Sequence, residues 1–294
     1  MAIVQPQTVY VDDSGTEPNA RIVVAAFCVS PVRKWKQFEA AWIAAEDTYG
    51  FKEFHMTEFA GCRRGAWCRD CLSGKTDATQ HPWRDWSNTK RHNLLTELLR
   101  IVCKYTQQGF GIAFTKEEID GHVQNPRLQE LAPGAFGRQH FTFAATTCGG
   151  ELAKWRAKQA EFPPIKFVFD LCNEEQKLEI AKAFVAENQV KPRIADGVEH
   201  WFDVDGNGIS FESRKKTRQL LSADMLAWVT AKIRAAALFP TTFRRRGGWG
   251  KEVSMVAFKF VDSGKLNIGY NTEASLRDWL DREIKFWEQH EAQE

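Results

Sequence analysis

The chain has 294 residues, of which 43% are hydrophobic and 12% aromatic, enough for a substantial core in one large domain or two modest ones. Forty basic and 38 acidic residues leave a formal charge of +2, which excludes a histone-like polybasic protein but permits local phosphate-binding clusters. The longest apolar run, 22–29, is far shorter than the ~20 residues of a membrane-spanning helix, so we expect no membrane association.

The N-terminal residues and the cysteines favour a cytoplasmic protein. Residues 1–8 have neither a charged segment nor an apolar core, so we expect no secretory signal. The seven cysteines are an odd number, and Cys28 and Cys103 lie inside apolar stretches, where a free cysteine behaves as a small hydrophobic residue. A reducing compartment fits this usage best.

In chain order, predicted strands alternate with predicted helices. The run TVYVD at 8–12 predicts a strand that ends in a turn, and the nearly continuous apolar run 21–29 predicts a second strand, buried on both faces of a sheet. Further strands are expected at 109–115, at 165–170, at either 190–195 or 209–212, at 253–260 and at 266–270. Helical periodicity is found from 31 to about 45, after Asn88 as the expected N-cap, at 138–158, 173–188 and 218–237, and from 273.

Strands interleaved with helices, opening on a hairpin, predict an α/β protein with a mixed sheet flanked by helices. Residues 61–88 are rich in Cys, Trp, Arg, Gly and Asp without clear periodicity, so we expect a Cys-rich, loop-like insertion there. We place one domain over 1–240, including the insertion. Residues 241–294 are expected to form a C-terminal extension, a β-hairpin followed by a helix, packed on that domain.

Three acidic residues lie at the ends of predicted strands. Asp12 and Asp13 end the first strand, and Asp170 ends the strand 165–170 just before a helix. An acid at a strand end beside a tight turn can point into a cleft. Asp is also favoured in turns and at helix N-termini, so a structural role is the alternative, although Asn173 already offers a cap after Asp170.

A fourth acid, Asp224, lies on the apolar face of the predicted helix 218–237. Leu220, Leu221, Ala227 and Trp228 share its face by i±3 and i±4 spacing. A buried carboxylate is costly unless it is paired, hydrogen-bonded or metal-bound. We therefore favour a functional acid, with a salt bridge to a basic neighbour as the structural alternative.

Carboxylates gathered at one place repel one another, and one of them becomes neutral unless a cation joins them. Mg²⁺ and Mn²⁺ prefer such oxygen ligands, and two ions about 4 Å apart can activate water and stabilise the leaving oxygen in phosphodiester cleavage. This chemistry needs acids from several elements and no special nucleophile. The expected catalytic and metal-binding residues are Asp12, Asp13, Asp170 and Asp224, with Mg²⁺ or Mn²⁺ as the cofactor.

The segment Tyr10-Val-Asp12-Asp13-Ser-Gly resembles the Tyr-x-Asp-Glu-Ser-Gly motif that opens the family called domain of unknown function 3800. The segments FHMTEF at 54–59 and SADMLAW at 222–228 resemble later blocks, so the resemblance covers roughly 8–230. It implies a ribonuclease H-like fold, with Asp12 as the first of the family's suspected functional acids and Asp224 as the last.

The chain departs from the family pattern at two positions. Asp13 stands where the family has Glu, a conservative change, and Leu221 stands where it has Gln, although Gln219 is nearby. The loss of that amide weakens the expectation of catalysis. The resemblance also implies Glu58 as a further metal ligand, with a solvated helix position as its alternative. His55, between two apolar residues, is either a ligand or, as is commoner for such a histidine, a structural residue.

The insertion contains a candidate zinc site. Cys62, Cys68 and Cys71 are followed by His81, and the spacing of Cys68 and Cys71 suits one half of a zinc site. No second C-x2-C or H-x3-H half is present. A structural Zn²⁺ and unligated thiols in a flexible insertion are both compatible with this pattern.

Two basic runs are candidates for nucleic-acid contact. Arg244, Arg245 and Arg246 stand beside Trp249, and Arg214 to Lys216, with Lys215 at the centre, form the other run. Together with the Trp residues of the insertion, at 67, 83 and 86, they predict phosphate contacts and base stacking on single-stranded nucleic acid. Solvated protein surface is the alternative.

The leading hypothesis from the sequence is a metal-dependent phosphodiesterase, a nuclease acting on nucleic acid through its cluster of carboxylates. A non-catalytic ribonuclease H-like binding or adaptor module is the alternative, which the Leu221 substitution favours. A weaker third hypothesis is a zinc-stabilised interaction protein in which the Cys-rich insertion is the functional part.

Overall fold

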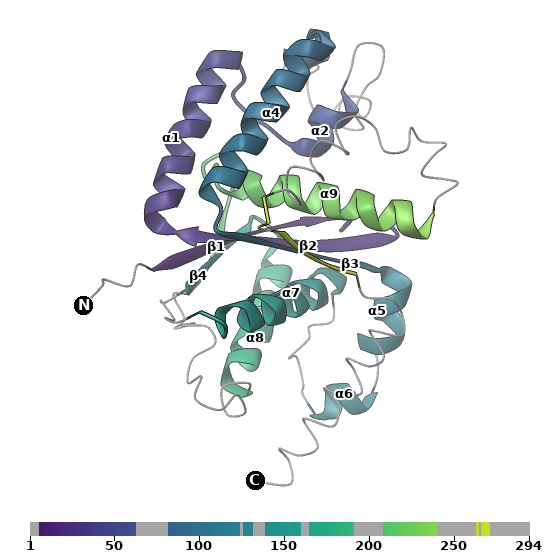
Figure 1. Ribbon diagram of the computed structural model, residues 1–294. Coiled ribbons are helices and arrows are strands. Elements are labelled where there is room, and N and C mark those ends of the chain that lie inside the picture. Colours follow the sequence, from purple (N-terminus) through teal and green to yellow (C-terminus); the bar gives the residue numbers. More distant parts are fainter. Residues whose placement is uncertain are drawn as a thin grey trace, which may run out of the picture.

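The computed structural model describes residues 6–62, 82–123, 126–131, 139–159, 165–190, 208–239, 263–264 and 266–270. The described strands form one six-stranded sheet with helices on both faces (Figure 1). The strands are β1 (Gln7–Ser14), β2 (Ile22–Pro31), β3 (Gln108–Thr115), β4 (Ile165–Asp170), β5 (Ile209–Glu212) and β6 (Leu266–Tyr270). Their order across the sheet is β5-β4-β1-β2-β3-β6.

The sheet is mixed because its three central strands pair antiparallel, whereas the strands outside them pair parallel. Strands β1, β2 and β3 form an antiparallel meander, and β4 then returns parallel to β1. At the edges, β5 lies parallel to β4 and β6 lies parallel to β3. The mixed α/β sheet opening on a hairpin, predicted from the sequence, is therefore confirmed.

Helices cover the two faces of the sheet (Figure 1). One face carries α1 (Val32–Tyr49), α2 (Met56–Gly61), α4 (Asn88–Tyr105) and α9 (Leu220–Leu238). The other face carries α5 (Lys116–Val123), α7 (His140–Arg156) and α8 (Glu174–Val190), with the short α6 (Pro126–Leu131) after α5. Helix α9 crosses β1, β2 and β3 directly. None of the described helices is long and apolar enough to cross a membrane.

Strand β2 shows why the sheet is buried on both sides. Val23, Ala25, Phe27 and Val29 pack toward α7, whereas the alternating residues Val24, Ala26 and Cys28 pack toward α1 and α9. All seven are fully buried. The nearly continuous apolar run that predicted a doubly covered strand thus separates two hydrophobic cores.

The close approach of α9 to the sheet depends on Gly111 of β3. A Cβ atom at this position would lie 2.4 Å from the Thr230 Oγ1 atom of α9. Since a side chain at residue 111 would collide with that of Thr230, glycine lets the helix lie close on the strands. The helix that carries Asp224 is thus packed closely on β1, β2 and β3.

The elements match the predicted ones with a few differences. Of the two candidates for a fifth strand, the structure shows 209–212. Helix α4 is capped by Ser87, whose hydroxyl accepts the Lys90 N–H, and not by Asn88 as predicted. The predicted partner strand of β6 at 253–260 and the terminal helix from 273 lie outside the described residues. The proposed division at residue 240 therefore stays a prediction, while β6 joins the main sheet.

The described residues at the two ends of the predicted insertion are ordered against the core. Residues Pro82–Asp85 form a 3-10 helix, η2, and Trp83 is buried against Phe54 and Phe59. The Arg91 guanidinium of α4 binds the backbone carbonyls of both Cys62 and Trp83, at 2.9 and 3.1 Å. The two ends of the insertion are thus fixed in the core, and its bounds at about 61–88 stay a prediction.

Candidate acidic centre

The sheet register brings Asp12 and Asp170 to the same end of neighbouring strands. The parallel pairing of β1 with β4 ends where Val11 pairs with Phe169, and the two aspartates are the next residue of each strand. The Asp12 side chain is 2% exposed, and its Oδ1 atom accepts the Asp13 N–H at 2.9 Å. The acids predicted at two separate strand ends are therefore neighbours in the fold.

Helix α9 brings the third acid to this place from the face above the sheet. Asp224 is 3% exposed and lies in the second turn of the helix. Its Oδ2 atom accepts the backbone N–H of Met56 at 2.8 Å, and its Oδ1 atom lies 3.2 Å from His55 Nε2. The salt bridge expected as the structural alternative for Asp224 is therefore present, with His55 as one partner.

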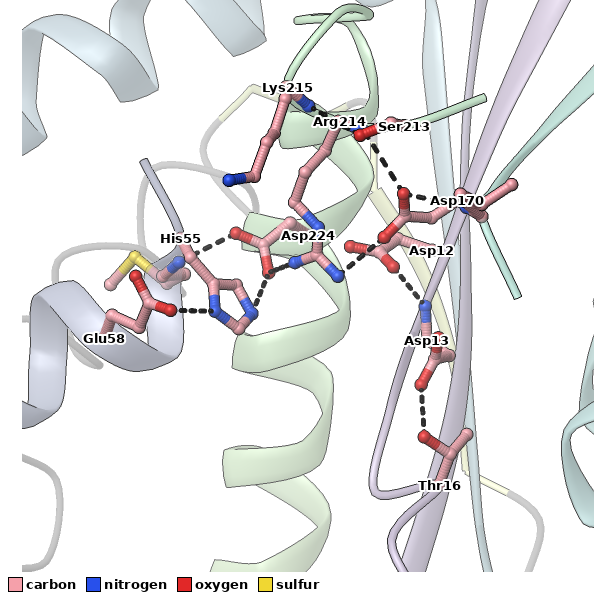
Figure 2. A network of polar contacts seen from close by, with 12 residues as sticks. Asp12, Asp13, Thr16, His55, Glu58, Asp170, Ser213, Arg214, Lys215 and Asp224 are labelled. Atoms are coloured by element: carbon pink, nitrogen blue, oxygen red, sulfur yellow. Dashed lines mark hydrogen bonds and ion pairs between the residues drawn. The ribbon is translucent and has the colours of Figure 1, made fainter. Parts of the chain in front are cut away.

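Arg214, in the turn between β5 and α9, lies among the acids (Figure 2). Its Nη2 atom lies 2.6 Å from Asp170 Oδ2, and its Nη1 atom lies 3.8 Å from Asp224 Oδ1. The backbone N–H of Arg214 also donates to Asp170 Oδ1, at 3.2 Å. One guanidinium therefore bridges the end of β4 and the start of α9, beside Asp12.

The charges at the centre do not balance around Asp12. Burial raises the pKa of the Asp12 carboxyl well above its usual range, and the attraction of Arg214 does not offset this effect. The negative charges of Asp224, Asp13 and Asp170 raise it further. Burial also raises the pKa of Asp13, against the opposing effects of the Thr16 hydroxyl, which donates to it at 2.8 Å, and of Arg214. The centre therefore favours additional positive charge.

Unlike Asp12, the carboxylate of Asp224 has its negative charge well compensated, chiefly by His55. Burial favours the neutral form of Asp224, but His55, Arg214 and the Met56 N–H together lower its pKa. Burial likewise disfavours the His55 imidazolium, yet the Asp224 charge and the hydrogen bonds to Asp224 and Glu58 raise its pKa to about 10. At neutral pH this pair is an ion pair of a carboxylate and an imidazolium.

Glu58, predicted as a metal ligand, lies on the far side of His55. Its Oε1 atom is 3.5 Å from His55 Nδ1, while Nε2 of the same ring faces Asp224 (Figure 2). Glu58 is therefore joined to the acidic centre through the imidazole ring. His55, whose role the sequence left open, links two acids through its ring.

The four predicted acids Asp12, Asp13, Asp170 and Asp224 thus come together, but not as a ready-made metal site. Within the residues that the structure describes, no group of three His, Cys, Asp or Glu side chains has the arrangement of metal ligands. The donor set nevertheless suits a hard divalent ion, because it consists of carboxylate oxygens and contains a buried Asp12 whose charge is poorly compensated. Arg214 gives only part of this compensation.

The zinc prediction is mostly outside the described residues. Cys62 is fully buried at the end of α2 and belongs to the same hydrophobic core as residues of α1, α4 and α9. The other three predicted ligands, Cys68, Cys71 and His81, are not among the described residues. The zinc site therefore stays a prediction.

The predicted nucleic-acid contacts are described only in part. Lys215 is an exposed residue beside the acidic centre, with its Nζ atom 3.1 Å from Glu53 Oε1. Arg244, Arg245, Arg246 and Trp67 lie outside the described residues. Stacking on Trp83 is excluded because this ring is only 1% exposed. Trp86 is half-buried, packed between Tyr49 and the Lys90 ammonium.

Sequence reasoning missed the central position of Arg214. The prediction treated it as one member of a basic run. Only its place in the chain could have indicated that it pairs with the acids. Arg214 lies between a short strand and the helix that carries Asp224. The acids predicted at strand ends also needed a cation nearby. An arginine that close to a buried acid is a natural candidate for its partner.

The sheet defines the class of the protein: it has a ribonuclease H-like α/β fold. An antiparallel β1-β2-β3 meander is followed by β4 and β5 on the β1 side, each parallel to its neighbour, with helices on both faces. The crystal structure of ribonuclease H2 from Pyrococcus horikoshii OT3 is similar over 95% of this chain and 98% of its own, with 11% identity and a TM-score of 0.37. No family model and no curated protein matches the sequence.

Proposed function

We propose that the protein is a metal-dependent phosphodiesterase that cleaves nucleic acid at the acidic centre. One observation supports this above the others: Asp12, Asp170 and Asp224, from three separate elements, surround a single guanidinium and leave the buried Asp12 poorly compensated. Fixed carboxylates that gather against their mutual repulsion are a costly arrangement for stability alone. They are the arrangement that phosphodiester chemistry with Mg²⁺ or Mn²⁺ uses.

In this proposal Asp12, Asp170 and Asp224 would hold the divalent ion. Asp13 would contribute to the site of a second ion. When bound, such an ion supplies Lewis-acid activation of the phosphate and of the attacking water. The chain itself supplies rigid placement. Asp170 Oδ1 accepts the Leu171 and Arg214 backbone N–H groups, and Asp224 Oδ2 accepts that of Met56. Backbone donors thus orient both carboxylates before any ligand arrives.

The substrate class rests on charge and on the resemblance noted from the sequence. Lys215 is exposed next to the centre, and the run from Arg244 to Arg246 adds basic residues that we propose contact the phosphate backbone. The family called domain of unknown function 3800, which the sequence motifs resemble, fits this proposal through its suspected acidic residues. We further propose that Cys62, Cys68, Cys71 and His81 hold a structural Zn²⁺.

The proposal is tested by incubating the protein with labelled single- and double-stranded DNA and RNA, with and without Mn²⁺. We expect Mn²⁺-dependent cleavage that is lost in Asp12→Asn, which keeps the shape of the side chain and removes its charge. Asp47→Asn, the same change at an exposed position of α1, is the matched control and should cleave like the wild type. Equal cleavage by Asp12→Asn and the wild type would refute the assignment.

A second candidate function, a non-catalytic binding or adaptor module, is favoured by Arg214 itself. Its guanidinium already gives the acids a positive charge, so the centre has an internal counter-ion. Leu221 in place of the expected Gln points the same way. An adaptor needs no metal at these acids. Calorimetric titration with Mn²⁺ therefore distinguishes the two, since only the nuclease proposal requires binding that depends on Asp12.

A further inference from the structure

We infer that Arg214 exchanges partners during the proposed reaction: it neutralises Asp170 and Asp224 in the metal-free protein and binds the substrate phosphate once a divalent ion occupies the acids. The inference rests on the proposed function and adds a positioning residue to it. In this inference one side chain has two roles: it is the internal counter-ion of the acids, and it binds the substrate phosphate.

The backbone around Arg214 is fixed, so a change of partner would involve its side chain alone. Thr217 Oγ1 donates to Glu212 Oε2 at 2.6 Å, and the N–H groups of Lys216 and Thr217 donate to the Ser213 carbonyl at 2.9 and 3.0 Å. Immediately after this turn, Arg218 binds Glu46 of α1 through two atoms, at 2.8 and 2.9 Å. The turn at residues 213–217 therefore holds the backbone of Arg214 in place at the edge of the acidic centre.

The Arg214 side chain, in contrast, is only partly enclosed. It is 32% exposed, whereas the Asp224 carboxylate that it approaches is 5% exposed. Its contact with Asp170 is close at 2.6 Å, but that with Asp224 is loose at 3.8 Å. The guanidinium thus faces the acids while about a third of the side chain is open to solvent, on the side from which a ligand would approach.

The two proposed ligands of Arg214 have matching chemistry. A guanidinium presents its N–H groups as a planar fork that binds a carboxylate or a phosphate with similar geometry. A divalent ion that takes oxygens of Asp170 and Asp224 would repel the guanidinium and remove its partners. A phosphodiester bound at that ion brings new anionic oxygens to the same place, so the displaced guanidinium has a partner within reach of its rigid turn.

This exchange has a consequence that does not depend on catalysis. Because Arg214 and the divalent ion compete for the same carboxylates, each weakens the binding of the other. Removing the guanidinium should therefore strengthen the binding of metal, whereas the loss of a residue that merely holds the site together should weaken it. Whether the affinity for the metal rises or falls therefore distinguishes a competing counter-ion from a merely structural residue.

The test is calorimetric titration of Mn²⁺ into the wild type, Arg214→Gln and Arg214→Lys, with circular dichroism to verify folding. We expect Arg214→Gln to bind Mn²⁺ about fivefold more tightly or better, the low end of typical coupling between two sites. Arg214→Lys keeps a positive charge but loses the fork, so it should bind Mn²⁺ much like the wild type. Arg33→Gln, the same change at an exposed position of α1, should leave the affinity for Mn²⁺ unchanged.

Substrate measurements complete the test. In the presence of saturating Mn²⁺, both Arg214 variants should raise the KM for a nucleic acid more than they lower kcat. If the wild type binds Mn²⁺ but Arg214→Gln binds it equally or less tightly, the exchange of partners is wrong while the proposed nuclease stands. If the wild type itself binds no Mn²⁺ at millimolar concentrations, the proposed function fails, and the inference fails with it.

Discussion

Asp224 accepts a hydrogen bond of 2.8 Å from the backbone N–H of Met56, so a carboxylate on α9 fixes the first turn of α2. The other oxygen of the same carboxylate faces His55 and Arg214. Asp224 therefore serves the fold and the candidate site together. A variant of Asp224 would disturb both, which makes Asp12, whose described hydrogen bond is local, the cleaner probe of function.

The charge of Asp12 should cost stability in the metal-free protein. Since burial raises its pKa, the folded chain binds this proton more tightly than the unfolded chain, and stability falls as pH rises above the ordinary aspartate pKa of 3.8. In the presence of a chelator at pH 7, we expect Asp12→Asn to melt at a higher temperature, by about 2–4 °C for each kcal/mol relieved. Near pH 4 the difference should shrink. A lower melting temperature at pH 7 would contradict the account of the centre.

The pair of His55 and Asp224 should make stability decline in alkaline solution. The pKa of His55 is raised from 6.5 to about 10, so its stabilising effect is complete below pH 6.5 and is lost as pH rises through about 10. Denaturant unfolding of chelated protein at pH 6 and pH 10 should show the wild type losing about 1–3 kcal/mol more than His55→Gln. Equal losses in the two proteins would show that the ion pair does not form.

The packing of α9 on the sheet should tolerate no side chain at residue 111. In Gly111→Ala the new methyl group would meet the Thr230 hydroxyl oxygen at 2.4 Å, so we expect a loss of about 1–3 kcal/mol in the free energy of unfolding. Thr230→Ala removes that oxygen, and the double variant should recover part of the loss in urea unfolding. If the two effects simply add, the close contact is not the cause.

Two buried cysteines should resist alkylation in the folded protein. Burial raises the pKa of Cys28 to about 12 and raises that of Cys148 well above its usual range. Because the thiolate is the reactive form, iodoacetamide at pH 8.5 should leave both unmodified. Peptide mapping by mass spectrometry measures this, with protein unfolded in guanidinium as the control. Rapid native labelling of Cys28 would place it nearer the surface.

The sequence predicted elements best where one physical signal was strong. The apolar run of β2 and the i±3/i±4 stripe around Asp224 reflect burial, and burial dominates these elements. Capping was harder, because Ser87 and Asn88 are both good caps and only the backbone geometry selects between them. Trp83 was wrongly placed in a loop because its burial comes from Phe54 and Phe59, which are distant in sequence.

The sequence predicted the acidic residues of the candidate site. It did not predict the basic residues that balance their charge. Asp12, Asp170 and Asp224 could be singled out because strand ends and an apolar helix face are local features. The positions of Arg214 and His55 depend on how the β5-α9 turn and the start of α2 meet over the sheet. No local pattern specifies such a meeting, and a run of basic residues resembles ordinary solvated surface.

The most direct test of the central claim is an anomalous difference map from crystals soaked in Mn²⁺. The account predicts a peak in contact with carboxylate oxygens of Asp12, Asp170 and Asp224, with the Arg214 guanidinium turned away from Asp170. A map without a peak at these acids, in which Arg214 still binds Asp170, would contradict it.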